Sequence, residues 1–269
     1  MIESIESFVL KLVTGIALMW LLMPRKEVTD GFFRIQMLVA MGLSVLLVLV
    51  VQPGNPLQET NSLTNAMTTG MRTQAGNQLI RFAQLIAAVI AFAGHIVWKL
   101  GRRLPGAIAI YAVAILCLLS LMTASVAGGV SIDSLNLLLS DLASASVLGA
   151  TLTGMLLGHW YLTTPTMSIG PLSWFARALA VAAVVRLLMT SLALFRFGFA
   201  SHNLVHLWCL IIRIVGGILV PFATAVVVAR ILKYRNTQSA TGVLFASLIL
   251  VFMGEMTAAL LEHDLRIPY

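Results

Sequence analysis

Residues 154–165, Gly-Met-Leu-Leu-Gly-His-Trp-Tyr-Leu-Thr-Thr-Pro, end a long apolar segment with small residues, a histidine and an aromatic pair. Ala150, Gly154 and Gly158 recur at every fourth position and therefore lie on one face of a helix. A face of small residues lets a neighbouring helix or a flat ligand approach the backbone closely. The stretch predicts a helix packed inside a bundle, with His159 directed toward protein and not toward lipid.

The composition places the chain in a membrane. Hydrophobic residues make up 59% of the 269 residues and charged residues 10%, whereas about a quarter of the residues of a soluble domain are charged. Several apolar runs reach about 20 residues, enough for a helix to cross a hydrocarbon core of roughly 30 Å. The alternating pattern of a membrane β-barrel is absent. We therefore expect an all-α, polytopic membrane helix bundle, with residues 1–269 forming a single integral membrane domain.

The apolar runs predict eight transmembrane spans, at residues 6–23, 32–52, 79–100, 106–130, 139–163, 170–196, 204–232 and 241–262. The connection at 53–78 is long, polar and almost uncharged, so we expect a structureless external loop there. Asp133 and Asp141 are assigned to another outer connection. Pro221 follows Gly216 and Gly217 in the seventh span and is expected to kink that helix.

Positive charges gather at one end of the predicted spans. The connections after the first, third and seventh spans hold Arg25, Lys26, Arg34, Lys99, Arg102, Arg103, Arg230, Lys233 and Arg235. The positive-inside rule places these connections in the cytoplasm, so both termini are expected on the outer side of the cell inner membrane. Trp20, Trp98, Trp160 and Trp174 then fall at the inner ends of their spans, as an interfacial belt would require. The net charge of +7 is explained by these short connections, and we expect the lipid bilayer and no nucleic acid as a partner.

Three ionisable residues lie deep inside predicted spans, namely Arg186, Arg213 and Glu255. A charge at bilayer depth costs about 2.5–3.5 kcal/mol, so such groups pair with each other or face a cavity. Because the seventh and eighth spans are consecutive and antiparallel, Arg213 and Glu255 are predicted to form an ion pair. That pair either locks two helices together or belongs to a proton or ion relay in which Glu255 titrates, and the sequence leaves both interpretations open.

The histidines fall into two layers. His95 and His159 occupy the inner ends of the third and fifth predicted spans, and each directly follows a glycine. His206 and His263 lie at the outer ends of the seventh and eighth spans, with His202 close by in sequence. Two histidines at equal depth on different helices, each beside a gap, are what a six-coordinate b-type haem requires.

We therefore name His95 and His159 as candidate haem-iron ligands, and His206 and His263 as candidate ligands of a second, outer haem. Lys99, Arg102 and Arg103 lie where the propionates of the inner haem would emerge. The alternative is that histidines are tolerated at membrane interfaces and share depths by chance.

Three function classes follow from these residues. The first hypothesis is an inner-membrane electron-transfer subunit that binds haem b and exchanges electrons with quinone or another membrane redox subunit. The second is a small ion- or proton-coupled transporter that uses Glu255, Arg213 and Arg186. The third is a structural or assembly subunit of a larger membrane complex. Phosphate-binding loops, nucleophile elbows and zinc-protease motifs are all absent from the sequence.

Overall fold

The computed structural model describes residues 2–51, 74–126, 131–164, 167–198 and 203–265. Within these ranges eight helical spans are long and apolar enough to cross a membrane, which confirms the expected all-α membrane bundle. In chain order the helices are α1 (Ile2–Leu22), α2 (Asp30–Val50), α4 (Gln74–Lys99), α5 (Arg103–Ser125), α6 (Ile132–Thr163), α7 (Gly170–Phe197), α8 (Leu204–Ile214), α9 (Val220–Lys233) and α10 (Thr237–Leu265). A short 3₁₀ turn, Arg25–Glu27, joins α1 to α2.

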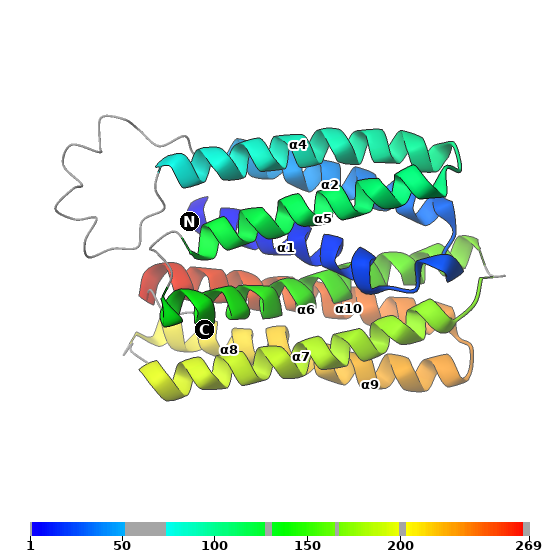
Figure 1. Ribbon diagram of the computed structural model, residues 1–269. Coiled ribbons are helices and arrows are strands. Elements are labelled where there is room, and N and C mark those ends of the chain that lie inside the picture. Colours follow the sequence, from blue (N-terminus) through cyan, green and yellow to red (C-terminus); the bar gives the residue numbers. More distant parts are fainter. Residues whose placement is uncertain (1, 52–73, 127–130, 165–166, 199–202, 266–269) are drawn as a thin grey trace.

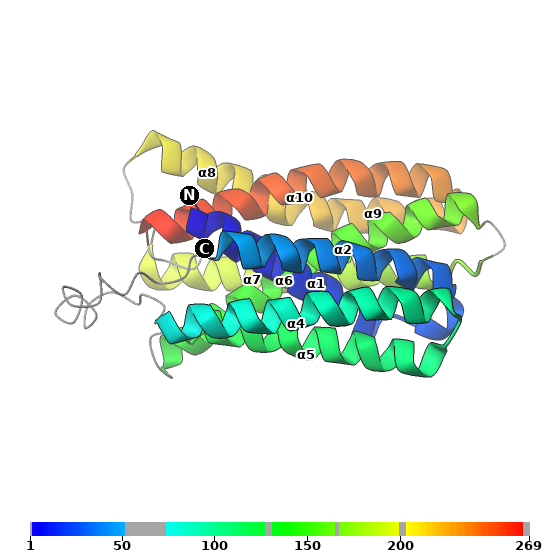
Figure 2. The same cartoon turned by 90° about the horizontal axis from the view of Figure 1, so that it is seen from above.

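The spans divide into two groups of four that follow the order of the chain (Figure 1). In the first group α1 packs on α2 and α5, and α4 packs on the same two helices. In the second group α6 packs on α7 and α10, and α9 packs on those two helices. The groups meet where α1 lies along α6, and the view from above shows α1 and α6 in the interior of the bundle (Figure 2). We call residues 2–125 the first half and residues 132–265 the second half.

Glycines allow α1 and α6 to touch backbone to backbone. A Cβ atom added to Gly15 of α1 would overlap the carbonyl group of Ala145, and one added to Gly149 would overlap the backbone of Gly15. Small residues at a helix crossing are the usual means by which helices associate in a bilayer, where burial of apolar surface supplies little driving force. The small residues of α6 therefore hold the two halves together.

The seventh predicted span is one helix interrupted by a π-helical turn. The turn covers Val215–Leu219, between α8 and α9, and ends two residues before Pro221. Proline donates no backbone hydrogen bond, and its ring crowds the carbonyl four residues earlier, so a regular α-helical turn is disfavoured at this place. Gly216 and Gly217 of the turn press against Gly254 of α10.

Two predicted boundaries were wrong. Helix α6 begins at Ile132, seven residues before the predicted start, because Ser131 caps it by accepting a hydrogen bond from the backbone N–H of Ser134. Asp141 therefore lies inside a span and not in a connection. Helix α4 begins at Gln74, so the end of the predicted loop at 53–78 is helical, and residues 52–73 of that loop lie outside the described residues.

The start of α1 and the end of α10, the described residues nearest the chain termini, lie at the same end of the bundle. His263 Nε2 at the end of α10 is 3.4 Å from Glu3 Oε2 at the start of α1. The side of the membrane that this end faces remains a prediction of the positive-inside rule. Trp20 and Trp98 are buried inside the bundle and do not face lipid as the predicted belt required, since Trp98 stacks on Phe33 of α2 at a centroid distance of 4.8 Å.

Candidate functional site

Six charged side chains, five of them buried, lie close together in the second half and at its contact with α1. They are Lys11 of α1, Asp141 of α6, Arg186 of α7, Arg213 of α8, and Glu255 and Glu262 of α10. All except Glu262 lie nine to eleven residues from the helix end on the side where α1 starts. At 1.5 Å per residue these five side chains lie about 15 Å from that end of their helices.

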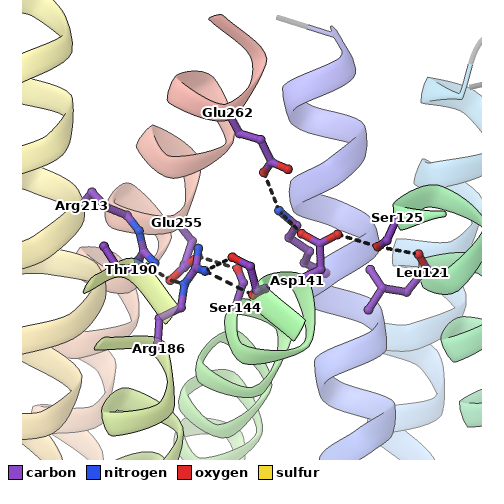
Figure 3. Close-up of polar contacts among 11 residues, drawn as sticks. Leu121, Ser125, Asp141, Ser144, Arg186, Thr190, Arg213, Glu255 and Glu262 are labelled. Carbon is purple, nitrogen blue, oxygen red and sulfur yellow. Dashed lines mark hydrogen bonds and ion pairs between the residues drawn. The ribbon is translucent and has the colours of Figure 1, made fainter. Parts of the chain in front are cut away.

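Glu255 binds two arginines (Figure 3). Arg213 Nη1 is 2.6 Å from Glu255 Oε1, and Arg186 Nη2 is 3.2 Å from Glu255 Oε2. The Ser144 hydroxyl of α6 donates to Glu255 Oε2 at 2.5 Å. The two guanidinium groups and the carboxylate carry one net positive charge in a place without solvent, because each of the three side chains is at most 2% exposed. We call Arg186, Arg213 and Glu255 the arginine cluster.

Neighbouring hydroxyls and carbonyls hold both guanidinium groups in place. Arg186 Nη1 donates to the hydroxyl of Ser140 at 2.7 Å and to its carbonyl at 3.2 Å. Arg213 Nη2 donates to Thr190 Oγ1 at 3.3 Å, but Arg213 Nε has no hydrogen-bond partner among the described residues. A buried donor without a partner costs free energy, so the arginine cluster retains one free donor on a charged group.

A second group of charges lies beside the first, nearer to α1. Lys11 Nζ is 2.8 Å from Asp141 Oδ1 and 2.9 Å from Glu262 Oε2. Ser125 of α5 donates to Asp141 Oδ2 at 2.7 Å (Figure 3). The Asp141 side chain is 8% exposed and the Glu262 side chain 26% exposed. We call Lys11, Asp141 and Glu262 the lysine triad, which carries one net negative charge and opens toward the end of the bundle where α1 starts.

The lysine triad was missed in the sequence, although one signal for it was present. Lys11 interrupts a run of apolar residues, and the only other lysine inside a predicted span, Lys99, lies one residue before the end of its span. Asp141 and Glu262 lay near predicted span ends, where a charge is unremarkable, so nothing marked them as partners of Lys11. Because α6 starts early, Asp141 lies nine residues inside the helix, where it can contact Lys11.

The structure places the inner histidines on helices with different packing partners. His95 lies on α4, which packs chiefly on α2 and α5, whereas His159 lies on α6, which packs chiefly on α1, α7 and α10. The Nδ1 atom of His95 is 3.0 Å from the carbonyl oxygen of Arg34, and His159 is exposed. No contact between these two rings is present among the described residues.

The spaces beside the preceding glycines are filled by protein. Gly158 faces Thr241 of α10, and Gly94 faces Met37 and Ala109. A flat macrocycle would need both spaces, so the described residues do not present the slot that the glycine-histidine pairs predicted. Haem binding remains a prediction, and it requires a Soret band in the absorption spectrum of the purified protein. A purified protein without that band would exclude it.

The outer histidines meet at one carboxylate. His206 Nε2 is 3.5 Å from Asp264 Oδ2, and His263 Nδ1 is 3.0 Å from Asp264 Oδ1. With Glu3 at its Nε2 atom, His263 has carboxylates at both ring nitrogens. No three His, Cys, Asp or Glu side chains in the described part of the chain are arranged to hold a metal ion. His202, the other outer candidate, lies outside the described residues.

No protein-family model, curated protein or solved structure matches the chain. Function is therefore inferred from the geometry of the buried charges.

Proposed function

We propose that the chain is a small proton-coupled membrane transporter whose working groups are Arg186, Arg213 and Glu255 together with the lysine triad. The observation that carries this proposal is a group of six charged side chains inside the bundle, in which Lys11 of the first half pairs with Asp141 and Glu262 of the second half and the arginine cluster lies beside them in the second half. In transporters built from two halves, substrate and coupling-ion sites lie near the bilayer midplane at the interface between the halves.

Stability alone does not require these charges. Replacing a buried ion pair by apolar side chains of similar volume is often neutral or stabilising, because the desolvation of both ions is avoided. The contact between the halves already has a close glycine crossing at Gly15 and Gly149. Five ionisable groups at this depth, with Glu262 beside them, therefore favour a role in binding or moving charge.

The π-helical turn supplies a place where the site can change shape. Arg213 lies two residues before Val215, the first residue of the turn, and Glu255 directly follows Gly254, which presses against the turn. π-Helical turns occur frequently at functional sites, and interrupted helices form the binding sites of many transporters. A small movement of α8 relative to α9 would shift Arg213 against Glu255.

The two guanidinium groups favour an anion as the transported solute. Arginine presents planar, paired donors that match carboxylate and phosphate oxygens, and Glu255 occupies that position in the described state. Arg213 Nε adds an unused donor. We propose that a small oxyanion competes with Glu255 for the arginines and crosses the bilayer together with a proton.

Proton uptake into proteoliposomes tests this function. The purified protein is reconstituted with pyranine inside the vesicles, and an inward gradient of inorganic phosphate, sulfate or succinate is imposed at equal pH on both sides, with equal potassium and valinomycin to hold the membrane potential near zero. We expect internal acidification faster than in protein-free vesicles with at least one of these anions. The Arg213→Gln/Glu255→Gln double variant should abolish this difference.

Asp133→Asn is the matched control, because Asp133 lies on α6 with an exposed side chain, 3.8 Å from the exposed Arg196. It should retain the acidification rate of the unaltered protein. Proteoliposomes that behave like protein-free vesicles with all three anions would contradict the proposed function and favour a structural subunit.

A further inference from the structure

The two halves of the bundle have corresponding packing patterns. The packing partners correspond when α1 is exchanged with α6, α2 with α7, α4 with α8 and α9, and α5 with α10. The contacts between halves obey the same exchange, since α1 packs on α10 and α6 packs on α5. Each half contains four spans, so the first helices of both halves run in the same direction, as parallel repeats do.

The lysine triad joins corresponding positions of the two halves. Lys11 is nine residues after the first residue of α1, and Asp141 is nine residues after the first residue of α6. Their salt bridge of 2.8 Å joins the two equivalent positions. The outer partners are equivalent too, because Lys11 reaches across to Glu262 of α10 and Asp141 reaches across to Ser125 of α5.

The charges of the lysine triad do not balance. One ammonium group faces two carboxylates, Asp141 from α6 and Glu262 from α10. Three charged groups of the arginine cluster also act on the triad, Arg186 and Glu255 on Lys11 and Arg213 on Glu262, but the two guanidinium groups are bound to Glu255. Helix α5 contributes only the neutral Ser125. Two carboxylates that share one counter-ion favour the uptake of one proton, since like charges at close range disfavour double ionisation.

We propose that Asp141 and Glu262 bind one proton between them and that this proton is the one coupled to transport, a proposal that rests on the proposed function. The proton comes from the aqueous phase at the end of the bundle where α1 starts and Glu262 is partly exposed. It converts one carboxylate to a carboxylic acid, and the same acid later releases it to the opposite phase. No other bond is made or broken.

Proton binding weakens the contact between the two halves. In the deprotonated state Lys11 ties α1 of the first half to α6 and α10 of the second half. Adding a proton removes one of the two ionic attractions on Lys11 and makes the triad neutral. The halves are then held chiefly by the glycine crossing, about which they can rock, and the positive arginine cluster next to the triad attracts an anion more strongly. This links the proton to the anion.

Infrared difference spectroscopy measures the proton directly. The purified protein is cycled between neutral and acidic buffer, and the carboxylic acid C=O stretch that appears on acidification is recorded. We expect one such band from the buried pair, which Asp141→Asn and Glu262→Gln should each abolish. Either substitution leaves a single carboxylate opposite Lys11. That carboxylate and the ammonium group form a balanced ion pair, which we expect to bind no proton between the neutral and the acidic buffer.

Asp133→Asn again serves as the control and should retain the band. An unaltered band in both Asp141→Asn and Glu262→Gln would overturn the proposal. If Asp141→Asn does not accumulate, Glu262→Gln alone decides, because its partly exposed side chain keeps a hydrogen-bonding oxygen for Lys11. If the substitutions abolish the band but the unaltered protein does not acidify proteoliposomes, the transport function is contradicted and the proton site stands. If the unaltered protein acidifies proteoliposomes but both variants keep the band, only the proton site is contradicted.

Discussion

Gly149→Ala is expected to cost about 3 kcal/mol of stability or to prevent accumulation of the folded protein. The added methyl group would overlap the carbonyl group and Cα of Gly15, which are backbone atoms and cannot rotate away. Relief requires α1 and α6 to separate, and this movement would loosen the ion pair between Lys11 and Asp141 at the same interface. The melting temperature in detergent, followed by fluorescence-detected size-exclusion chromatography, should fall by on the order of 10 °C.

Gly42→Ala provides the matched control. Gly42 lies in α2, where an added Cβ meets nothing within 4 Å. Alanine is a better helix former than glycine by about 1 kcal/mol, so this variant should melt at the same temperature as the unaltered protein or slightly higher. Equal melting temperatures for Gly149→Ala and Gly42→Ala would contradict the close crossing of α1 and α6.

The spans were predictable because each depends on the summed hydropathy of about twenty residues. An apolar run of this length has few alternatives to a membrane helix, and eight were identified. The start of α6 was missed because Asp133, Asn136 and Asp141 dilute the hydropathy of its first turns. In the structure Asp141 is paired with Lys11, so its polarity is compensated by a partner that hydropathy does not register.

Pairing between distant spans was much less predictable. Arg213 and Glu255 belong to consecutive antiparallel helices, so equal depth already indicated that they could meet, and they lie 2.6 Å apart. Lys11 and Glu262 are 251 residues apart in the chain. Their contact depends on the packing of α1 between the halves, a property of the whole bundle that no local pattern encodes.

For the histidines, equal depth in the sequence does not indicate which helices pack together. His95 and His159 both precede the inner ends of their helices by a few residues. They nevertheless belong to different halves, because α4 packs within the first half and α6 opens the second. Depth is one coordinate of three, and the other two come from packing.

Glu255→Gln is expected to destabilise the protein by about 3–5 kcal/mol, the cost of leaving buried charges without a partner. The substitution keeps the shape of the side chain but leaves Arg186 and Arg213 without the carboxylate that both bind. Two guanidinium groups would then face each other where no solvent reaches. We expect a strong loss of monodisperse protein in detergent.

The double variant Arg213→Gln/Glu255→Gln should recover most of that loss. It removes one positive and one negative charge, so the net charge of the six-residue cluster stays the same, while Arg186 keeps its bonds to the hydroxyl and carbonyl of Ser140. Two amides of similar length can hydrogen bond to each other and to Thr190. Recovery of folding without recovery of proton uptake would separate the two roles of the arginine cluster. Failure of the double variant to fold better than Glu255→Gln would show instead that the specific Arg213–Glu255 contact, and not its charge balance, holds α8 against α10.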